Sequence, residues 1–123
     1  MRRQLEQLFS QTFELVLINF FPSAKAALGP HSDDEKSLVE DSIIASVSLG
    51  ATRTARLLDK ETGRLVRTLT LGSGSLYSME LQTQKILMHQ ILPGEKDEGS
   101  RYSLTFRHMR MPNKRKGAQK LQE

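Results

Sequence analysis

Short apolar segments with a period of two, separated by turn residues at fairly regular spacing, constrain the fold of this chain most. Helix is favoured only at the start, over residues 3–9, where Leu5 and Leu8 share one face. In 123 residues, enough for one domain with a single core, this series predicts an antiparallel β-sandwich or squashed barrel. Strands are expected at residues 13–21, 43–49, 53–58, 65–71, 75–79, 85–92 and 101–108.

Glycine, proline and acidic residues mark the connections between these strands. The segment 25–41 contains Gly29-Pro30 and a cluster of acids, so it is expected to be a loop around His31. Residues 59–63 end in a glycine and are expected to join the two arms of a hairpin. The chain is therefore expected to be mainly β, with its first histidine in a loop.

The first segment with chemical content is His31-Ser32-Asp33, and a further histidine, His89, lies far along the chain. His31 and Asp33 are two residues apart, so in an extended segment both side chains project to the same side. The chain has no cysteine, which leaves only histidine and carboxylates as metal ligands. An early His-x-Asp with one distant His is the sequence form of a 2-His-1-carboxylate iron site.

His89 alone is compatible with a metal ligand and with an ordinary core residue. It shares one strand face with Leu87 and Ile91, where an imidazole among apolar neighbours needs a partner. That pattern by itself favours a hydrogen-bonded core histidine. The residues of the last expected strand favour the metal-ligand interpretation of His89.

The last expected strand places Arg101, Ser103, Thr105 and Arg107 on one face and apolar residues on the other. Two interpretations fit this pattern: a solvated outer face, or an interior pocket for a small dianion. Arginine binds carboxylates through a planar fork and stays charged when buried. Two arginines six residues apart, one for each end of a dicarboxylate, suit 2-oxoglutarate.

Several segments, taken in order, resemble the AlkB family of iron(II)- and 2-oxoglutarate-dependent dioxygenases, in particular its nucleic-acid demethylases. The resemblance extends over about residues 13–108 and rests on the order and spacing of its motifs. The matching segments are Leu17-Ile18-Asn19, Gly29, His31-Ser32-Asp33-Asp34-Glu35, Ile44-Ala45-Ser46-Val47-Ser48-Leu49-Gly50 with Arg53, Gly74-Ser75-Leu76, His89 and Arg101-Tyr102-Ser103-Leu104-Thr105-Phe106-Arg107.

The resemblance implies a double-stranded β-helix (jelly-roll) core with a short N-terminal helix, and it implies a role for each motif. Iron(II), 2-oxoglutarate as cosubstrate and O2 would serve the oxidative demethylation of N-alkylated bases in DNA or RNA, releasing succinate, CO2 and formaldehyde. The implied assignments are metal ligation by His31, Asp33 and His89, catalytic roles for Asp33 and Arg107, cosubstrate binding by Asn19, Phe21, Arg101, Ser103 and Arg107, and substrate contact by Glu35.

Two features depart from the family pattern. Phe21 stands where the family has tyrosine, and losing that hydroxyl's hydrogen bond costs about 1 kcal/mol, which predicts weaker cosubstrate binding. Only about a dozen residues precede Phe13, so most of the nucleotide-recognition lid and the first framework strands are expected to be missing. A hydroxylase or demethylase of a protein or small molecule, and a non-catalytic fragment that acts by binding, stay open as alternatives.

Charge and hydropathy bear on partners and location. The net charge is +4, and residues 110–123 are expected to form a basic, flexible tail after a catalytic core of 1–109. Such a tail either contacts phosphates or only aids solubility. No stretch is long enough to span a bilayer, and Glu6 and Glu14 argue against a signal peptide at residues 15–21. Together with the resemblance, which implies nucleic acid as partner, these patterns lead us to expect an intracellular protein of the cytoplasm or nucleus without membrane contact.

Overall fold

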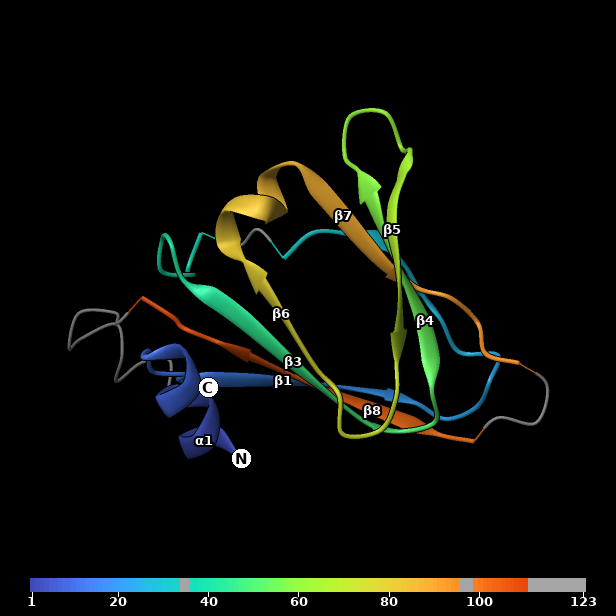
Figure 1. Ribbon diagram of the computed structural model, residues 1–123, viewed down its shortest axis with the longest axis horizontal. Coiled ribbons are helices and arrows are strands. Elements are labelled where there is room, and N and C mark those ends of the chain that lie inside the picture. The colour runs from blue at the N-terminus through green and yellow to red at the C-terminus, as the bar shows by residue number, and fades with distance from the viewer. Residues whose placement is uncertain (34–35, 96–98, 111–123) are drawn as a thin grey trace, which may run out of the picture.

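Two four-stranded antiparallel sheets face each other in the computed structural model, which describes residues 1–33, 36–95 and 99–110 (Figure 1). The first sheet has the strand order β1-β8-β3-β6 and the second has the order β2-β7-β4-β5. This is the mainly β, jelly-roll arrangement that the sequence predicts. The elements in chain order are α1 (Arg2–Phe9), β1 (Leu15–Phe21), β2 (Leu28–His31), β3 (Ile43–Gly50), β4 (Arg53–Asp59), β5 (Leu65–Leu71), β6 (Leu76–Glu80), the 3-10 helix η1 (Leu81–Lys85), β7 (Leu87–Ile91) and β8 (Arg101–Arg107).

The expected strands are present, with two differences next to the histidines. β2 lies inside segment 25–41, for which the sequence predicts a loop. It forms because it pairs with β7, where His31 is opposite His89, and local sequence does not reveal such a distant partner. The expected strand 85–92 is shorter, because η1 extends to Lys85 and β7 follows it. Residues 111–123, most of the expected basic tail, lie outside the described part of the chain.

The pairing of β1 with β8 brings alternate side chains together on the inner face of the first sheet. In this register Phe21 lies opposite Arg101, and Asn19 lies opposite Ser103. The inward side chains of β8 are buried, with Arg101 1% exposed and Arg107 4% exposed. The inward face of this strand therefore lines an interior cavity between the two sheets, and the solvated-face interpretation is wrong because these side chains are buried. Binding of a dianion in that cavity stays a prediction.

Helix α1 covers part of the outer face of the first sheet. Its Leu5 packs in one buried cluster with Phe13, Ala45, Val47 and Phe106. The rings of Phe13 and Phe106 meet edge to face with their centroids 6.0 Å apart. Burying each such large side chain contributes about 1.5–3 kcal/mol. Leu8, which the sequence predicts to share a face with Leu5, is 63% exposed, and Phe9 instead packs against this cluster.

Gly50, the last residue of β3, permits a close approach of the chain that leads into β8. Its φ is +97°, and an added Cβ would lie 2.5 Å from the carbonyl oxygen of Ser100. We therefore expect Gly50→Ala to lower the free energy of unfolding by about 1–3 kcal/mol in urea denaturation. The control is Gly63→Ala, because Gly63 has a φ of +75° but no atom within 4 Å of the added Cβ. Equal losses in the two variants would contradict this close approach.

Candidate metal centre and adjoining cavity

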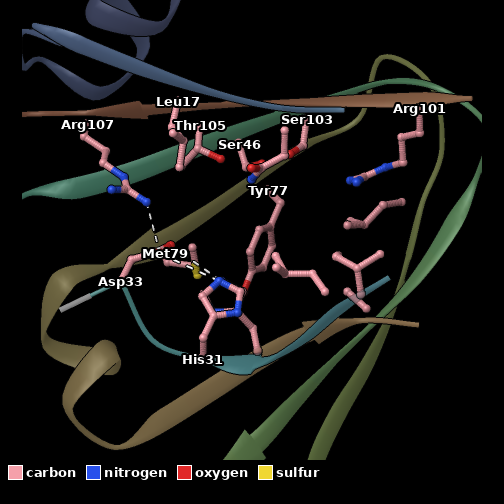
Figure 2. Close-up of a pocket in the computed structure, with 16 residues that line it drawn as sticks. Leu17, His31, Asp33, Ser46, Tyr77, Met79, Arg101, Ser103, Thr105 and Arg107 are labelled. Atoms are coloured by element: carbon pink, nitrogen blue, oxygen red, sulfur yellow. Dashed lines mark hydrogen bonds and ion pairs between the residues drawn. The ribbon is translucent and has the colours of Figure 1, made fainter. Parts of the chain in front are cut away.

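A cavity of about 290 Å³ lies between the two sheets, and polar or charged side chains from both sheets line it (Figure 2). One end holds His31, Asp33 and His89, and the other end holds Arg101. Apolar side chains of both sheets form the walls between these ends. The lining residues are Leu17, Asn19, Leu28, His31, Asp33, Ser46, Ala55, Leu71, Tyr77, Met79, His89, Ile91, Arg101, Ser103, Thr105 and Arg107.

Two histidines and one carboxylate converge at the first end. His31 of β2 and His89 of β7 are opposite each other in the strand register, and their ring centroids are 4.1 Å apart. Asp33 follows β2 and places its Oδ1 3.8 Å from His31 Nε2 and its Oδ2 3.5 Å from His89 Nε2. One ligand atom from each residue lies within 4.8 Å of the others. This donor set fits the facial triad of a non-haem iron site.

Each of the two imidazoles has a ring nitrogen whose lone pair is available to bind a metal. His31 Nδ1 is 2.9 Å from the carbonyl oxygen of Gly29, so an N–H there donates and leaves Nε2 free to ligate. Burial, and then the neighbouring His31, lower the pKa of His89 to about 4. His89 is therefore neutral at pH 7, which is the form that binds metal.

Asp33 is held from two sides. Its backbone N–H donates to Oε1 of the buried Gln84 at 3.0 Å, and Arg107 Nη2 donates to its Oδ1 at 3.0 Å. Ser32 Oγ, one residue earlier, donates to the carbonyl oxygen of Leu87 at 2.8 Å. These bonds tie the segment after β2 to η1, β7 and β8, so the carboxylate is oriented before any metal arrives.

Arg101 lies at the other end of the cavity. Its Nη2 donates to Ser48 Oγ at 2.8 Å, while its buried Nε and Nη1 have no hydrogen-bond partner among the described residues. Burial, and then the nearby charge of Arg53, lower the pKa of Arg101. Buried N–H donors on a cation are costly to leave unpaired. A carboxylate bound in the cavity would satisfy them, so the donor set here fits the distal end of a dicarboxylate such as 2-oxoglutarate.

The other residues suggested by the resemblance lie in three different environments. Asn19 and Ser103 line the cavity between the triad and Arg101. Phe21 does not line it; its ring lies beneath two guanidinium groups, 5.0 Å from the Arg101 carbon and 5.7 Å from that of Arg53. Contact between Phe21 and a cosubstrate therefore stays a prediction, whereas its support of Arg101 is observed. Glu35 lies outside the described residues.

The sequence-based assignments missed several residues of the site, chiefly Gln84, Ser48 and Tyr77. Gln84 and Ser48 act through contacts with residues 51 and 53 positions away in the chain, which no local pattern reports. Tyr77 could have been found from its period-two position, since it faces inward on β6. Burial, and then the charge of Asp33, raise the pKa of Tyr77 to about 12, so its hydroxyl stays protonated at neutral pH.

Two facing antiparallel sheets that bring two histidines and a carboxylate to one end of a cavity are the fold and site of the non-haem iron oxygenases. Residues 2–107 match the model of the 2OG-Fe(II) oxygenase superfamily, and the chain belongs to this superfamily. Its relatives place it among the AlkB-like members. The family implies iron(II) as cofactor and 2-oxoglutarate and O2 as cosubstrates, in agreement with the donor sets at the two ends of the cavity.

The relatives are similar over most of this chain but are much longer. The mouse protein named alpha-ketoglutarate-dependent dioxygenase alkB homolog 3 is 35% identical over 115 residues, covering 87% of this chain and 40% of the mouse protein. The bovine protein named DNA oxidative demethylase ALKBH2 is 36% identical over 121 residues, covering 93% of this chain and 44% of the bovine one. The chain therefore spans less than half the length of either relative.

A solved structure supports the fold independently. The structure titled "The structure of OsALKBH1" superposes with a TM-score of 0.66 at 21% identity, covering 79% of this chain and 48% of that chain. In the described part of the chain, no helix is both long and apolar enough to cross a membrane.

Gln84 gives a test of how the metal centre is oriented. We expect Gln84→Met to weaken metal binding about 10–100-fold, because the Asp33 amide loses its acceptor and the carboxylate its orientation. Competition between the protein and a coloured chelator for zinc measures this affinity. Gln82→Met is the matched control, since Gln82 lies in the same 3-10 helix but bonds to the exposed Asp41. Equal affinities in the two variants would show that Gln84 does not orient the centre.

Proposed function

We propose that this chain binds iron(II) and 2-oxoglutarate in the cavity and catalyses oxidative demethylation of N-alkylated bases in DNA or RNA. The observation that carries the proposal is that one cavity has a set of metal ligands at one end and a group suited to bind a carboxylate at the other. A 2-His-1-carboxylate cluster lies at one end, and the unpaired buried donors of Arg101 lie at the other. Superfamily membership and relatives named as AlkB-type dioxygenase and DNA oxidative demethylase support the same reaction class.

In this proposal His31, Asp33 and His89 hold the iron, and Arg101 holds the distal carboxylate of 2-oxoglutarate. The chemistry that iron and 2-oxoglutarate supply when bound is oxidation of an N-methyl group by dioxygen, with succinate, CO2 and formaldehyde as products. Arg107 keeps the Asp33 carboxylate in place through its 3.0 Å bond. Residues 1–109 serve as the catalytic core.

The remaining cavity residues orient the cosubstrate and limit water. Asn19 and Ser103 offer an amide and a hydroxyl along the path between the triad and Arg101. Leu71, Ala55 and Ile91 of the second sheet present apolar walls, and all three are buried. Apolar walls strengthen the attraction between Arg101 and a carboxylate, because they exclude the water that would screen it.

The test follows both products in one reaction. Purified protein is mixed with iron(II), 2-oxoglutarate and an oligonucleotide that carries N-methylated adenine and cytosine, and succinate and repaired base are measured. Production of both, dependent on iron and on the methylated oligonucleotide, supports the proposal. Succinate without repaired base would contradict a nucleic-acid substrate and favour a protein or small molecule. No iron-dependent binding of 2-oxoglutarate would overturn the catalytic proposal.

A further inference from the structure

Tyr77 lies on β6, an edge strand of the first sheet, and lines the cavity from its inner face. It pairs with Ser46 of β3, Ser46 pairs with Thr105 of β8, and Thr105 pairs with Leu17 of β1. All four residues line the cavity, so they form one row across the sheet. On β8 this row lies two residues before Arg107, at the metal end of the cavity.

The Tyr77 ring stands across the space between the sheets, and its hydroxyl points toward His31 (Figure 2). The residue is half-buried, and no hydrogen bond joins its hydroxyl to any other described residue. A tyrosine hydroxyl offers one O–H donor. An inward donor without a partner, beside a cluster of metal ligands, is suited to a ligand oxygen at that cluster.

A second cavity, of about 420 Å³, lies beyond the same side chain. Tyr77, Met79 and His89 line both cavities, so they form the wall that separates them. A dicarboxylate reaching from the triad to Arg101 therefore has the Tyr77 ring as one of its walls. The strand register places Tyr77 level with Thr105, two residues before Arg107, along that path.

We propose that Tyr77 is a positioning residue whose hydroxyl donates a hydrogen bond to the metal-chelating end of bound 2-oxoglutarate; this rests on the function proposed above. The bond lies at the opposite end from Phe21, which shares a row with Arg101. Tyr77 thus gives this chain a phenol donor to the cosubstrate although Phe21 has no hydroxyl. A hydrogen bond from a neutral donor to a charged acceptor predicts a loss of about 10-fold to 100-fold in affinity when it is removed.

The experiment compares Tyr77→Phe with Tyr102→Phe, which removes the other tyrosine hydroxyl of the chain from an exposed position. Anaerobic protein loaded with iron(II) is titrated with 2-oxoglutarate, and the visible charge-transfer band of the chelated 2-oxo acid is followed. We expect Tyr77→Phe to weaken binding at least about 10-fold and to shift the band, whereas Tyr102→Phe changes neither. Unchanged affinity and band position in Tyr77→Phe would overturn the inference. Absence of the band in the unaltered protein would overturn the proposed function as well.

A second measurement uses a protein in which Tyr77 itself is intact. The chain has no tryptophan, so Tyr102→Phe leaves Tyr77 as the only phenol or indole chromophore. With zinc in place of iron, adding 2-oxoglutarate is expected to shift the ultraviolet absorption of this phenol to longer wavelength, whereas glutarate, which lacks the 2-oxo group, is not. Identical difference spectra with the two acids would overturn the assignment of the hydroxyl to the chelating end.

Discussion

Asp33→Asn is expected to abolish iron binding, with an affinity loss of more than about 100-fold, and to remove iron-dependent turnover. The amide keeps the shape of the carboxylate and an oxygen that accepts from Arg107, but it removes the only negative charge of the triad. Changing a residue that merely orients a ligand costs about 10–100-fold, so loss of a ligand itself costs more. The remaining His31 and His89 are neutral ligands and leave the charge of the metal uncompensated.

Thermal unfolding with and without zinc separates metal binding from stability in this variant. A metal that binds only the folded state at 100 times its dissociation constant stabilises it by about 2.7 kcal/mol. The unaltered protein should therefore melt at a higher temperature with zinc, and Asp33→Asn should not. The matched control is Asp41→Asn, which changes an exposed carboxylate outside the triad and should keep the zinc effect. A zinc effect of full size in Asp33→Asn would contradict the assignment of Asp33 as a ligand.

The sequence predicts the long strands of this fold but not every element that forms the site. β8 alternates polar and apolar side chains over seven residues, which is the signal of a strand with two different faces. β1 is instead an apolar run of seven residues in which only Asn19 is polar, and the proline that follows it marks its end. β2 has only four residues, two of them glycine and proline, so its local sequence favours a loop. Its pairing with β7 is nevertheless what places His31 opposite His89, and the metal centre depends on it.

The residues of the candidate site also differ in whether the sequence alone could identify them. His31, Asp33 and His89 were identified because their chemistry is rare and their order matches a family, and the structure brings them together. Gln84 and Ser48 are common polar residues, and only the folded chain gives them Asp33 and Arg101 as partners. Residue type therefore identifies the groups proposed to bind metal or cosubstrate, while the groups that orient them depend on tertiary contacts.

Arg101→Met is expected to eliminate measurable 2-oxoglutarate binding while leaving the unliganded protein at least as stable. Arg101 is 1% exposed, makes one side-chain hydrogen bond, to Ser48, and lies near the positive charge of Arg53. Two of its buried nitrogen atoms, Nε and Nη1, have no partner in the described residues, and each such group costs about 1–3 kcal/mol. Methionine has a similar length and removes this cost, although it loses the contact of the guanidinium with the Phe21 ring.

Loss of 2-oxoglutarate binding without loss of stability distinguishes an arginine that binds the cosubstrate from one that stabilises the fold. Replacing a buried arginine that served the fold would lower the free energy of unfolding by several kcal/mol. Leaving Ser48 Oγ unpaired costs less, about 1–3 kcal/mol. Urea denaturation without ligand, and zinc-dependent binding of 2-oxoglutarate by calorimetry, measure the two quantities on the same preparation. Arg56→Met, at an exposed position of β4, is the control and should change neither. Destabilisation of Arg101→Met by several kcal/mol together with intact 2-oxoglutarate binding would mean that the arginine holds the sheets together and that the dicarboxylate binds elsewhere.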